Sequence, residues 1–318
     1  MISTPTKILQ ALVSCALAGA ASAQTIGIVT TPAGSFSNSA GQAIAKVLVG
    51  KAKLRAVVQA QASTGFAEVE SGTADFNVSN SFDATFFATG TGEYQGQGKH
   101  PVMRYVGALI PYRVAMHVRA DSGIKTIDDL KGKRISSDFN AQKTIARVIA
   151  AHLANARLSY EDVVKVPAPN ITRQADDFMS GRVDVLFFAL GSAAIKQANA
   201  SVGGLRVLEV STSPEAMKRT EALIPGAYVM QVDPDPALEG ITRPTNLVAF
   251  DMVLITNAKV PDDVVYTVAK TLHDNKQDLV ATFPPFGLFH PQNMAKRLQG
   301  VPMHPGAVKY YREVALLR

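Results

Sequence analysis

A strand–helix–strand pattern that occurs twice constrains the fold more than any other feature of this sequence. The first copy reads SGTAD followed by FNV at 71–78, and the second reads SGRVD followed by VLF at 180–187, 109 positions later. In each copy a residue able to cap a helix, Ser63 or Thr172, stands nine positions before the glycine. Strands that alternate with helices predict right-handed βαβ units and mostly parallel sheets, and hence an α/β protein. Two interpretations fit this pattern: two generic βαβ units, or two related lobes that face each other.

The start of the chain shows the same alternation. Residues 25–30 predict a strand, a Gly/Ser-rich loop follows at 32–39, and further strands are expected at 54–58 and 75–79. Spacings of three and four predict a helix after the loop, with an inward face formed by Ala40, Ala43, Ile44, Val47 and Leu48. We expect Gly50 to end this helix, because glycine favours helix C-termini.

Two long β-rich runs, at 105–118 and 247–256, mark where the chain passes between the lobes. A chain that leaves one lobe, builds the second and returns needs two such crossings. We therefore predict lobe 1 from 24–112 together with 255–318, and lobe 2 from 113–254.

The first 23 residues have the pattern of a secretory signal peptide. Lys7 is their only charged residue, an apolar run extends over 8–20, and Ala21-Ser22-Ala23 is a small-x-small cleavage site. The apolar run is too short to span a bilayer, which takes roughly 20 residues. We expect cleavage after Ala23 and an exported, periplasmic protein.

This segment has two other interpretations. It can be a short buried helix, or Leu12-Val13-Ser14-Cys15 can be a lipoprotein cleavage box. Cys15 is the only cysteine of the chain. Cleavage after Ala23 would therefore exclude disulfides and thiolate chemistry from the mature protein.

Charge and motifs exclude several classes of function. The formal net charge is +6, and the basic residues are scattered, with no cluster beside aromatic residues. We therefore expect no nucleic acid partner, and the modest positive excess favours anionic solutes only weakly. The sequence contains no H-E-x-x-H, G-x-S-x-G or P-loop motif. We expect no enzyme activity, no metal and no cofactor, although a periplasmic hydrolase stays open because catalytic triads form in space.

Four motifs follow one another along the mature chain. They are GSFSNSAGQAI at 34–44, STG at 63–65 with SGTAD at 71–75, DSGI at 121–124 with DLKGKR at 129–134, and FFALG at 187–191. In this order they resemble the TAXI solute receptors of tripartite ATP-independent periplasmic (TRAP) transporters. DLKGKR by itself is common to many binding proteins of this fold.

The resemblance implies a two-lobed periplasmic binding protein of type II, in which each lobe is a mostly parallel sheet flanked by helices and two hinge crossings join the lobes. It implies a receptor that binds a small organic anion, glutamate-like or another carboxylate, dicarboxylate or aromatic acid. The receptor would deliver this solute to the membrane permease subunits of a TRAP transporter, driven by an ion gradient. We expect a monomer. A binding protein of an ABC importer, with the same fold, is the alternative.

Two segments depart from the family pattern. Ser37 and Asn38 stand where the first loop usually has a Tyr pair, and Ala141-Gln142-Lys143-Thr144 replaces a GSGT-like helix entry. Both segments are expected to touch ligand, so these departures bear on the solute rather than on the fold.

The candidate ligand-binding residues lie in loops that follow strands, because open α/β sheets bind ligands outside the carboxyl ends of their strands. In lobe 1 they are Gly34, Ser35, Phe36, Ser37, Asn38, Ser63, Thr64, Gly65, Asn80, Ser81 and Asp83. In lobe 2 they are Asp138, Asn140, Ala141, Thr172, Arg173, Phe188 and Gly191.

The chemistry of this set suits an anion. A helix that begins at Ser63-Thr64-Gly65 would present free N–H groups to a carboxylate. Arg173 would clamp a second carboxylate, and Phe36 or Phe188 would cover an apolar body. Each residue also has a structural interpretation: Ser63 and Asp83 as helix caps, Arg173 as a solvated charge, Phe188 as core and Gly34 as a turn residue.

Overall fold

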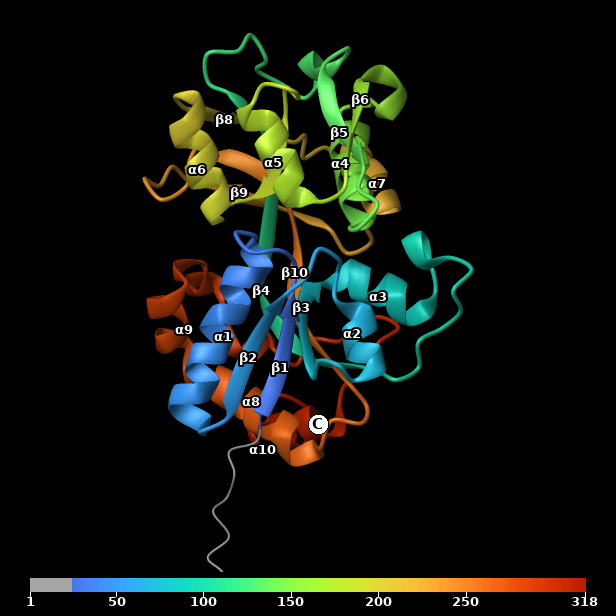
Figure 1. Ribbon diagram of the computed structural model, residues 1–318, viewed down its shortest axis with the longest axis vertical. Helices are drawn as coiled ribbons and strands as arrows, with labels where there is room; N and C mark the ends of the chain where they lie inside the picture. Colours follow the sequence, from blue (N-terminus) through green and yellow to red (C-terminus); the bar gives the residue numbers. More distant parts are fainter. Residues whose placement is uncertain (1–24) are drawn as a thin grey trace, which may run out of the picture.

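The computed structural model describes residues 25–318. The predicted signal peptide, with its lipoprotein alternative at Cys15, lies outside the described residues. Two groups of helices and strands are stacked along the long axis and joined by β4 (Met103–Arg119) and β10 (Thr245–Asn257) (Figure 1). The predicted lobe boundaries at 112 and 254 fall within these two strands. The division stays a prediction, and we keep the names lobe 1 and lobe 2 for its ranges.

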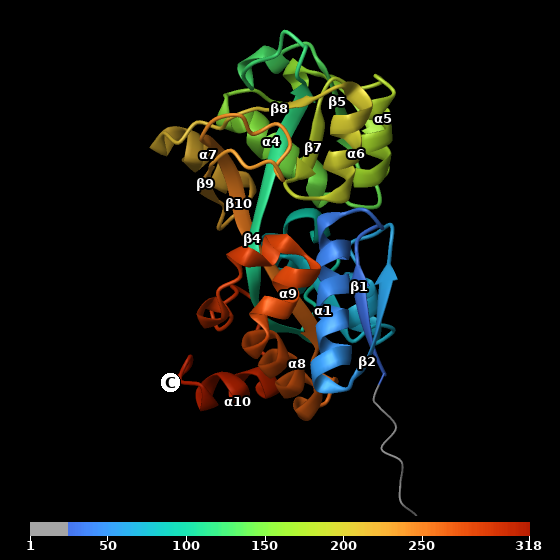
Figure 2. The same cartoon turned by 90° about the vertical axis from the view of Figure 1, so that its left-hand side faces the viewer.

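Lobe 1 contains both ends of the described chain. Its first elements are β1 (Thr25–Thr30), α1 (Phe36–Ala52), β2 (Arg55–Ala60), α2 (Phe66–Ser71), β3 (Phe76–Asn80), α3 (Ser81–Thr89) and the 3-10 turn η1 (Gly92–Tyr94). After the return crossing it contains α8 (Asp262–Asp274), α9 (Lys276–Thr282), η4 (Pro284–Leu288), η5 (Pro291–Asn293) and α10 (Pro305–Glu313). In Figure 2, α1, α8 and α9 lie together below the junction of the two groups.

Lobe 2 is built between the two crossings. Its elements are η2 (Asp128–Leu130), β5 (Arg134–Asp138), α4 (Thr144–Asn155), η3 (Tyr160–Asp162), β6 (Val164–Ala168), α5 (Ile171–Met179), β7 (Leu186–Ala189), α6 (Ala193–Val202), β8 (Leu205–Val207), α7 (Pro214–Leu223) and β9 (Tyr228–Val232). The strands β5 and β6 pair in parallel as a separate two-stranded sheet.

One large mixed sheet runs through both groups, in the order β2-β1-β3-β10-β4-β7, with β8 on β4 and β9 on β10. The strand β1 is parallel to β2 and to β3, as alternating strands and helices predict. The two crossing strands are antiparallel to each other and to their neighbours. Their register shifts between Asp251 and Val253, where Pro111 stands opposite Asp251. Proline has no N–H for the ladder, so it suits this irregular point between the lobes.

The inward face predicted for α1 is confirmed, whereas its predicted end is wrong. The five apolar residues of that face are at most 3% exposed: Ala40, Ala43, Ile44, Val47 and Leu48. The helix continues past Gly50 to Ala52, and Lys53 takes the left-handed conformation at φ 57° instead. Within this extension, Lys51 pairs with Asp278 of α9 at 3.2 Å.

The helix caps predicted from the repeat are also wrong. Gly65, not Ser63, precedes α2, with φ 81°. A Cβ there would lie 2.7 Å from the Asn77 amide nitrogen, so this tight approach requires glycine. In the second copy Asn170, not Thr172, caps α5 and accepts from the Arg173 N–H at 2.9 Å.

Within residues 25–318, no helix combines the length and apolar character needed to cross a bilayer.

Candidate functional site

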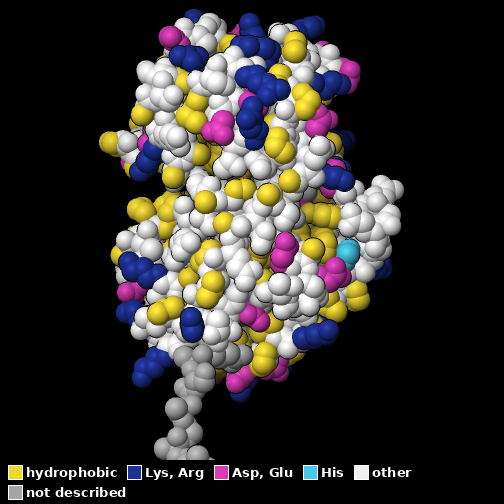
Figure 3. Space-filling model, in the orientation of Figure 1, with side chains coloured by type: hydrophobic (Ala, Val, Ile, Leu, Met, Phe, Trp, Pro, Cys, Tyr) yellow, Lys and Arg dark blue, Asp and Glu magenta, His cyan; other side chains and the backbone are white. Residues whose placement is uncertain are grey.

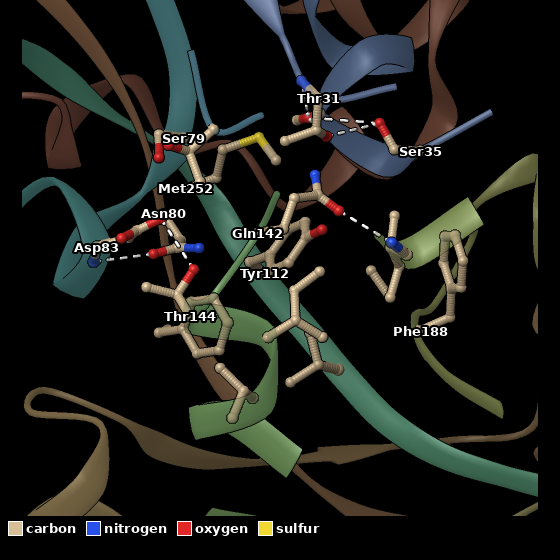
Figure 4. A pocket seen from close by; sticks show the side chains of 18 of the residues that line it. Thr31, Ser35, Ser79, Asn80, Asp83, Tyr112, Gln142, Thr144, Phe188 and Met252 are labelled. Carbon is tan, nitrogen blue, oxygen red and sulfur yellow. Dashed lines mark hydrogen bonds between the residues drawn. The ribbon is translucent and has the colours of Figure 1, made fainter. Parts of the chain in front are cut away.

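A cavity of about 80 Å³ lies where strand ends from both lobes meet (Figure 4). Lobe 1 lines it with Thr31, Ser35, Ser37, Thr64, Val78, Ser79, Asn80, Asp83 and Tyr112. Lobe 2 lines it with Val114, Gln142, Thr144, Ile145, Val148, Ile171, Phe187, Phe188, Ala189, Phe250 and Met252. The volume is below the roughly 300 Å³ at which pockets for drug-sized ligands begin, so the cavity suits a small solute.

Three hydroxyl groups form one edge of the cavity, after β1 and at the start of α1. We call Thr31, Ser35 and Ser37 the α1 hydroxyl cluster. Ser35 caps α1 by accepting from the Asn38 N–H at 3.2 Å. The Thr31 hydroxyl lies 2.8 Å from that of Ser35 and also bonds the Ser37 hydroxyl. These groups therefore order one another beside the positive end of a long helix.

Asp83 forms the opposite edge, in the first turn of α3. Its side chain is buried, at 1% exposure. Oδ2 accepts from the Thr144 hydroxyl of α4 at 3.1 Å, which joins the two lobes (Figure 4). Oδ1 has no hydrogen-bond partner among the described residues. The capping of α3 falls to Asn80, whose Oδ1 accepts from the Asp83 N–H at 3.0 Å, so Asp83 is not the structural cap.

Burial controls the ionisation of Asp83. Removal from water raises its pKa to about 7, and the Tyr94 and Thr144 hydroxyls offset only part of this increase. The neighbouring carboxylate of Glu93 raises the pKa further. Near neutral pH this carboxyl group is therefore present in both its protonated and its ionised form.

Aromatic side chains from the crossing strands form a wall of the cavity. Tyr112 of β4 and Phe250 of β10 have ring centroids 5.4 Å apart. Phe36 packs edge-on against Tyr112 at 5.0 Å, and Phe82 packs edge-on against Phe250 at 4.9 Å. Both wall residues are therefore fixed from behind. Burial raises the pKa of Tyr112, so its hydroxyl stays neutral.

Lobe 2 contributes fewer polar groups. Gln142 is 2% exposed and accepts from the Ile171 N–H at 2.9 Å through Oε1. This bond ties the start of α4 to the start of α5, and Figure 4 shows Gln142 between the two. Thr144 is the second polar group at the start of α4.

The cavity contains few charges. No Lys, Arg or His lines it among residues 25–318, and the same part of the chain has no group of three His, Cys, Asp or Glu residues placed to hold a metal. On the face drawn in Figure 3, basic side chains gather over lobe 2, away from the waist of the molecule. Asp83 is thus the lining residue most able to carry a charge near neutral pH.

The structure brings six of the predicted residues into the lining: Ser35, Ser37, Thr64, Asn80, Asp83 and Phe188. It places the others outside the lining: Gly34, Phe36, Asn38, Ser63, Gly65, Ser81, Asp138, Asn140, Ala141, Thr172, Arg173 and Gly191.

Several of the outer residues have structural contacts that explain their position. The Asn38 amide donates to the Thr30 hydroxyl at 3.0 Å inside lobe 1. Arg173, half exposed, pairs with Asp177 of its own helix at 3.0 Å. Gly191, with φ 78°, lies against Pro285, to which a Cβ would approach within 3.2 Å. Gly34 has φ 83° and open space around it, as expected of a turn glycine.

The residues that the motifs missed are mostly on strands rather than in loops. Gln142 and Thr144 belong to the segment that departs from the family pattern, and this departure could have indicated them as lining residues. Tyr112, Phe250 and Met252 come from the crossing strands, close to Pro111. The sequence could have indicated them as well, because both strands are the predicted crossings, and side chains at a crossing are expected to face the space between the predicted lobes.

Comparison with known proteins gives a family and a fold. A family model described as the NMT1-like family matches residues 28–314. A solved structure described as a periplasmic transporter aligns with a TM-score of 0.56 and 12% identity, covering 92% of this chain and 93% of that one. A protein of Bordetella bronchiseptica RB50 aligns with a TM-score of 0.54 and 14% identity, covering 92% and 98%.

A third structure is the amino acid ABC transporter substrate-binding protein AbpA of Streptococcus pneumoniae, bound to L-arginine. It aligns with a TM-score of 0.50 and 13% identity, covering 83% of this chain and 95% of that chain. At these identities the likeness establishes the fold, which is that of type II periplasmic substrate-binding proteins, as predicted. These alignments do not identify the solute of this chain.

Proposed function

The chain belongs to the NMT1-like family, and from this premise we propose that it is an exported solute receptor that closes around one small molecule and passes it to a membrane transporter. The observation that carries the proposal is the cavity between the strand ends of lobe 1 and lobe 2. Ligands of α/β sheets bind at this position. The side chains there are mainly apolar, with a few convergent polar groups, which is the usual make-up of a small-molecule site.

Contacts across the cavity support closure of the lobes around a ligand. The Thr144 hydroxyl of lobe 2 donates to Asp83 of lobe 1 at 3.1 Å, and Arg147 of lobe 2 pairs with Glu93 of lobe 1 at 2.6 Å. The two lobes are otherwise joined mainly by β4 and β10. We propose that rotation about these strands opens and closes the cavity, with the division into lobes at 112 and 254.

For the transporter, we propose a TRAP system of the TAXI type. The four ordered motifs from Gly34 to Gly191 support this proposal. An ABC importer is the second candidate, because AbpA, a binding protein of an ABC transporter, shares the fold. Neighbouring genes distinguish the two: a large permease with many membrane spans accompanies a TRAP receptor, and an ATPase accompanies an ABC receptor.

The predicted organic anion receives less support from the lining than the receptor function does. Arg173, the predicted carboxylate clamp, points to Asp177 instead, and Asp83 brings potential negative charge into the cavity. The α1 hydroxyl cluster is the part of the lining best suited to a carboxylate. We therefore propose a small solute with an apolar part and polar ends, and we do not retain the requirement for negative charge.

Thermal-shift screening of the chain 24–318 against amines, amino acids, organic acids and aromatic compounds tests the receptor function. We expect at least one compound to raise the melting temperature in a dose-dependent way, and small-angle scattering to show a smaller radius of gyration with that compound. Thr144→Val should weaken this binding, whereas Thr267→Val, on the surface of α8 and away from the cavity, should not. Turnover of a chromogenic ester panel, abolished by one point mutation, would instead favour a hydrolase.

A further inference from the structure

Asp83 is a buried acid that does not cap its own helix and has only one oxygen in a hydrogen bond of ordinary geometry. Its Oδ1 atom makes no hydrogen bond of ordinary length and angle among the described residues, although the side chain is only 1% exposed. The neighbouring Tyr94 hydroxyl acts on the carboxyl group from outside that geometry. Buried polar atoms are normally paired, and a carboxylate oxygen without a partner is costly. The adjacent helix already has its cap in Asn80. An oxygen that is buried, unpaired and at the wall of a cavity is placed to accept a hydrogen bond from a ligand.

The groups around Asp83 do not neutralise it. Tyr94 and Thr144 present hydroxyls, and Glu93 adds a second negative charge nearby. Arg147 is the cation of this region, and it is engaged by Glu93 at 2.6 Å and lies over the Phe86 ring at 5.2 Å. When Asp83 is ionised, its negative charge can therefore be compensated by a molecule that enters the cavity.

The apolar part of the lining is compatible with a cation. Tyr112 and Phe250 line the same cavity as Asp83. Aromatic faces attract ammonium and amidinium groups, and the attraction is stronger where water is excluded. A combination of one carboxylate with aromatic rings is a common design for binding organic cations.

We propose, on the basis of the proposed receptor function, that the solute carries a positively charged nitrogen that donates a hydrogen bond to Asp83 Oδ1 and lies near the aromatic wall of Tyr112 and Phe250. The α1 hydroxyl cluster then receives the polar end farther from this nitrogen. The solute class is a small organic amine or amidine, with or without a second polar group.

The affinity for such a solute depends on pH with a definite sign. The free protein holds Asp83 with a pKa of about 7, and a cation binds its ionised form. At pH 6 Asp83 is mostly protonated and must release its proton when a cation binds. At pH 8 it is mostly ionised already. The dissociation constant should be about tenfold lower at pH 8 than at pH 6. A solute that needs the protonated acid would show the opposite dependence.

Matched series of probes test this proposal on the chain 24–318 by isothermal titration calorimetry. One series is benzylamine, benzyl alcohol and benzoate, and the other is propylamine, 1-propanol and propionate. We expect the amine of at least one series to bind more tightly than its alcohol and its acid, and to gain about tenfold in affinity between pH 6 and pH 8. The proposal is overturned if no amine exceeds its matched partners, or if amine affinity falls as pH rises.

Variants separate Asp83 from the general charge of the protein. Asp83→Asn should remove both the preference for the amine and its pH dependence, whereas Asp176→Asn, an exposed acid on α5, should keep both. If Asp83→Asn does not fold, the pH profile of the unaltered chain still decides. Saturable binding of an acid or alcohol in preference to the amine overturns the cation and leaves the receptor function standing. Absence of binding by every compound of the screen opposes the receptor function itself.

Discussion

Lobe 1 and lobe 2 position their first strands with the same aspartate contact. In lobe 1, Asp75 Oδ2 accepts from the Gly27 N–H at 2.7 Å, and the Asp75 N–H donates to the Gly27 carbonyl at 3.0 Å. In lobe 2, Asp184 makes the same two bonds with Arg134, at 2.8 and 2.9 Å. These two aspartates are the last residues of the SGTAD and SGRVD copies. The repeat in the sequence therefore corresponds to a repeated contact between strands.

The two lobes differ in what their strand ends present to the cavity. Lobe 1 supplies the α1 hydroxyl cluster and Asp83, whereas lobe 2 supplies Gln142, Thr144 and many apolar side chains. The shared positions hold the sheets together, and the unshared positions carry the chemistry of the site. A repeat therefore identifies the architecture of such a protein better than its solute.

The largest effect is expected from replacing Asp83, the acid that distinguishes lobe 1. The folded pKa of Asp83, about 7, lies above its ordinary value of 3.8. The protonated form therefore stabilises the fold below pH 3.8, and this contribution is lost as pH rises through 7. Because asparagine stays neutral, Asp83→Asn should raise the free energy of unfolding at pH 8 by up to about 4 kcal/mol.

Urea unfolding at pH 8 and at pH 4 measures this effect, which should be much smaller at pH 4. Asp176→Asn serves as the exposed control and should change stability by less than about 0.5 kcal/mol. A loss of stability for Asp83→Asn at pH 8 would mean that the ionised carboxylate supports the fold, and the contrast between the lobes would then be structural.

The second-largest effect is expected from removing the aspartate contact that occurs once in each lobe. Asp75→Ala leaves the half-buried Gly27 N–H without a partner and should cost about 2 kcal/mol. Asp184→Ala leaves the more exposed Arg134 N–H, which water can reach, and should cost about 1 kcal/mol. Urea unfolding of both variants at pH 7 gives the difference. Equal losses would show that exposure of the N–H group does not matter at these positions.

The ion pair of lobe 2 accounts for little of this difference. Arg134 also pairs with Asp184 through its guanidinium, and this pair holds the pKa of Asp184 below its usual value even though burial acts in the opposite direction. The Arg134 side chain is 45% exposed, so Arg134→Ala should cost less than about 1 kcal/mol. A larger loss would mean that the pair, rather than the backbone contact, positions β5.

The sequence predicted the fold more completely than the site for a physical reason. Apolar spacing specifies burial, and it identified β1, the inward face of α1 and both crossing strands. Caps were assigned to the wrong residues because Ser63 and Thr172 compete with neighbours that suit the position better: Gly65 fits a close approach that no side chain allows, and the Asn170 side chain reaches the N–H that a cap must satisfy.

The site was predicted in part because strand ends can be located from sequence, whereas the direction of a side chain cannot. Ser35, Thr64 and Asp83 were expected near strand ends, and they line the cavity. The charge of Arg173 favours a contact with an anion, but Asp177, four residues later on the same helix, is its partner at 3.0 Å. The chemistry of the cavity depends on distances between lobes, and no local pattern encodes them.

A further prediction concerns the link between the lobes. Arg147 of α4 pairs with Glu93 of lobe 1, and each side chain is about a quarter exposed. Arg147→Ala should favour the open state and weaken solute binding about fivefold, equivalent to about 1 kcal/mol. Calorimetry measures the affinity, and scattering should show a larger radius of gyration. Lys165→Ala, which removes a pair with Glu161 inside lobe 2, should change neither; if it does, the effect of Arg147 comes from net charge.

The smallest expected effect tests the position of Arg173. The sequence suggested that its guanidinium binds the solute, and the structure places it on the surface of α5. Its partner, Asp177, is held by Arg182 as well, at 3.5 Å, so loss of one exposed pair leaves the buried carboxylate with a second cation. Arg173→Ala should therefore change the free energy of unfolding by less than about 0.5 kcal/mol and the dissociation constant by less than about twofold. A tenfold weaker affinity with unchanged stability would show that α5 turns toward the cavity when the lobes close, and lobe 2 would then contribute a charge to the site as lobe 1 does.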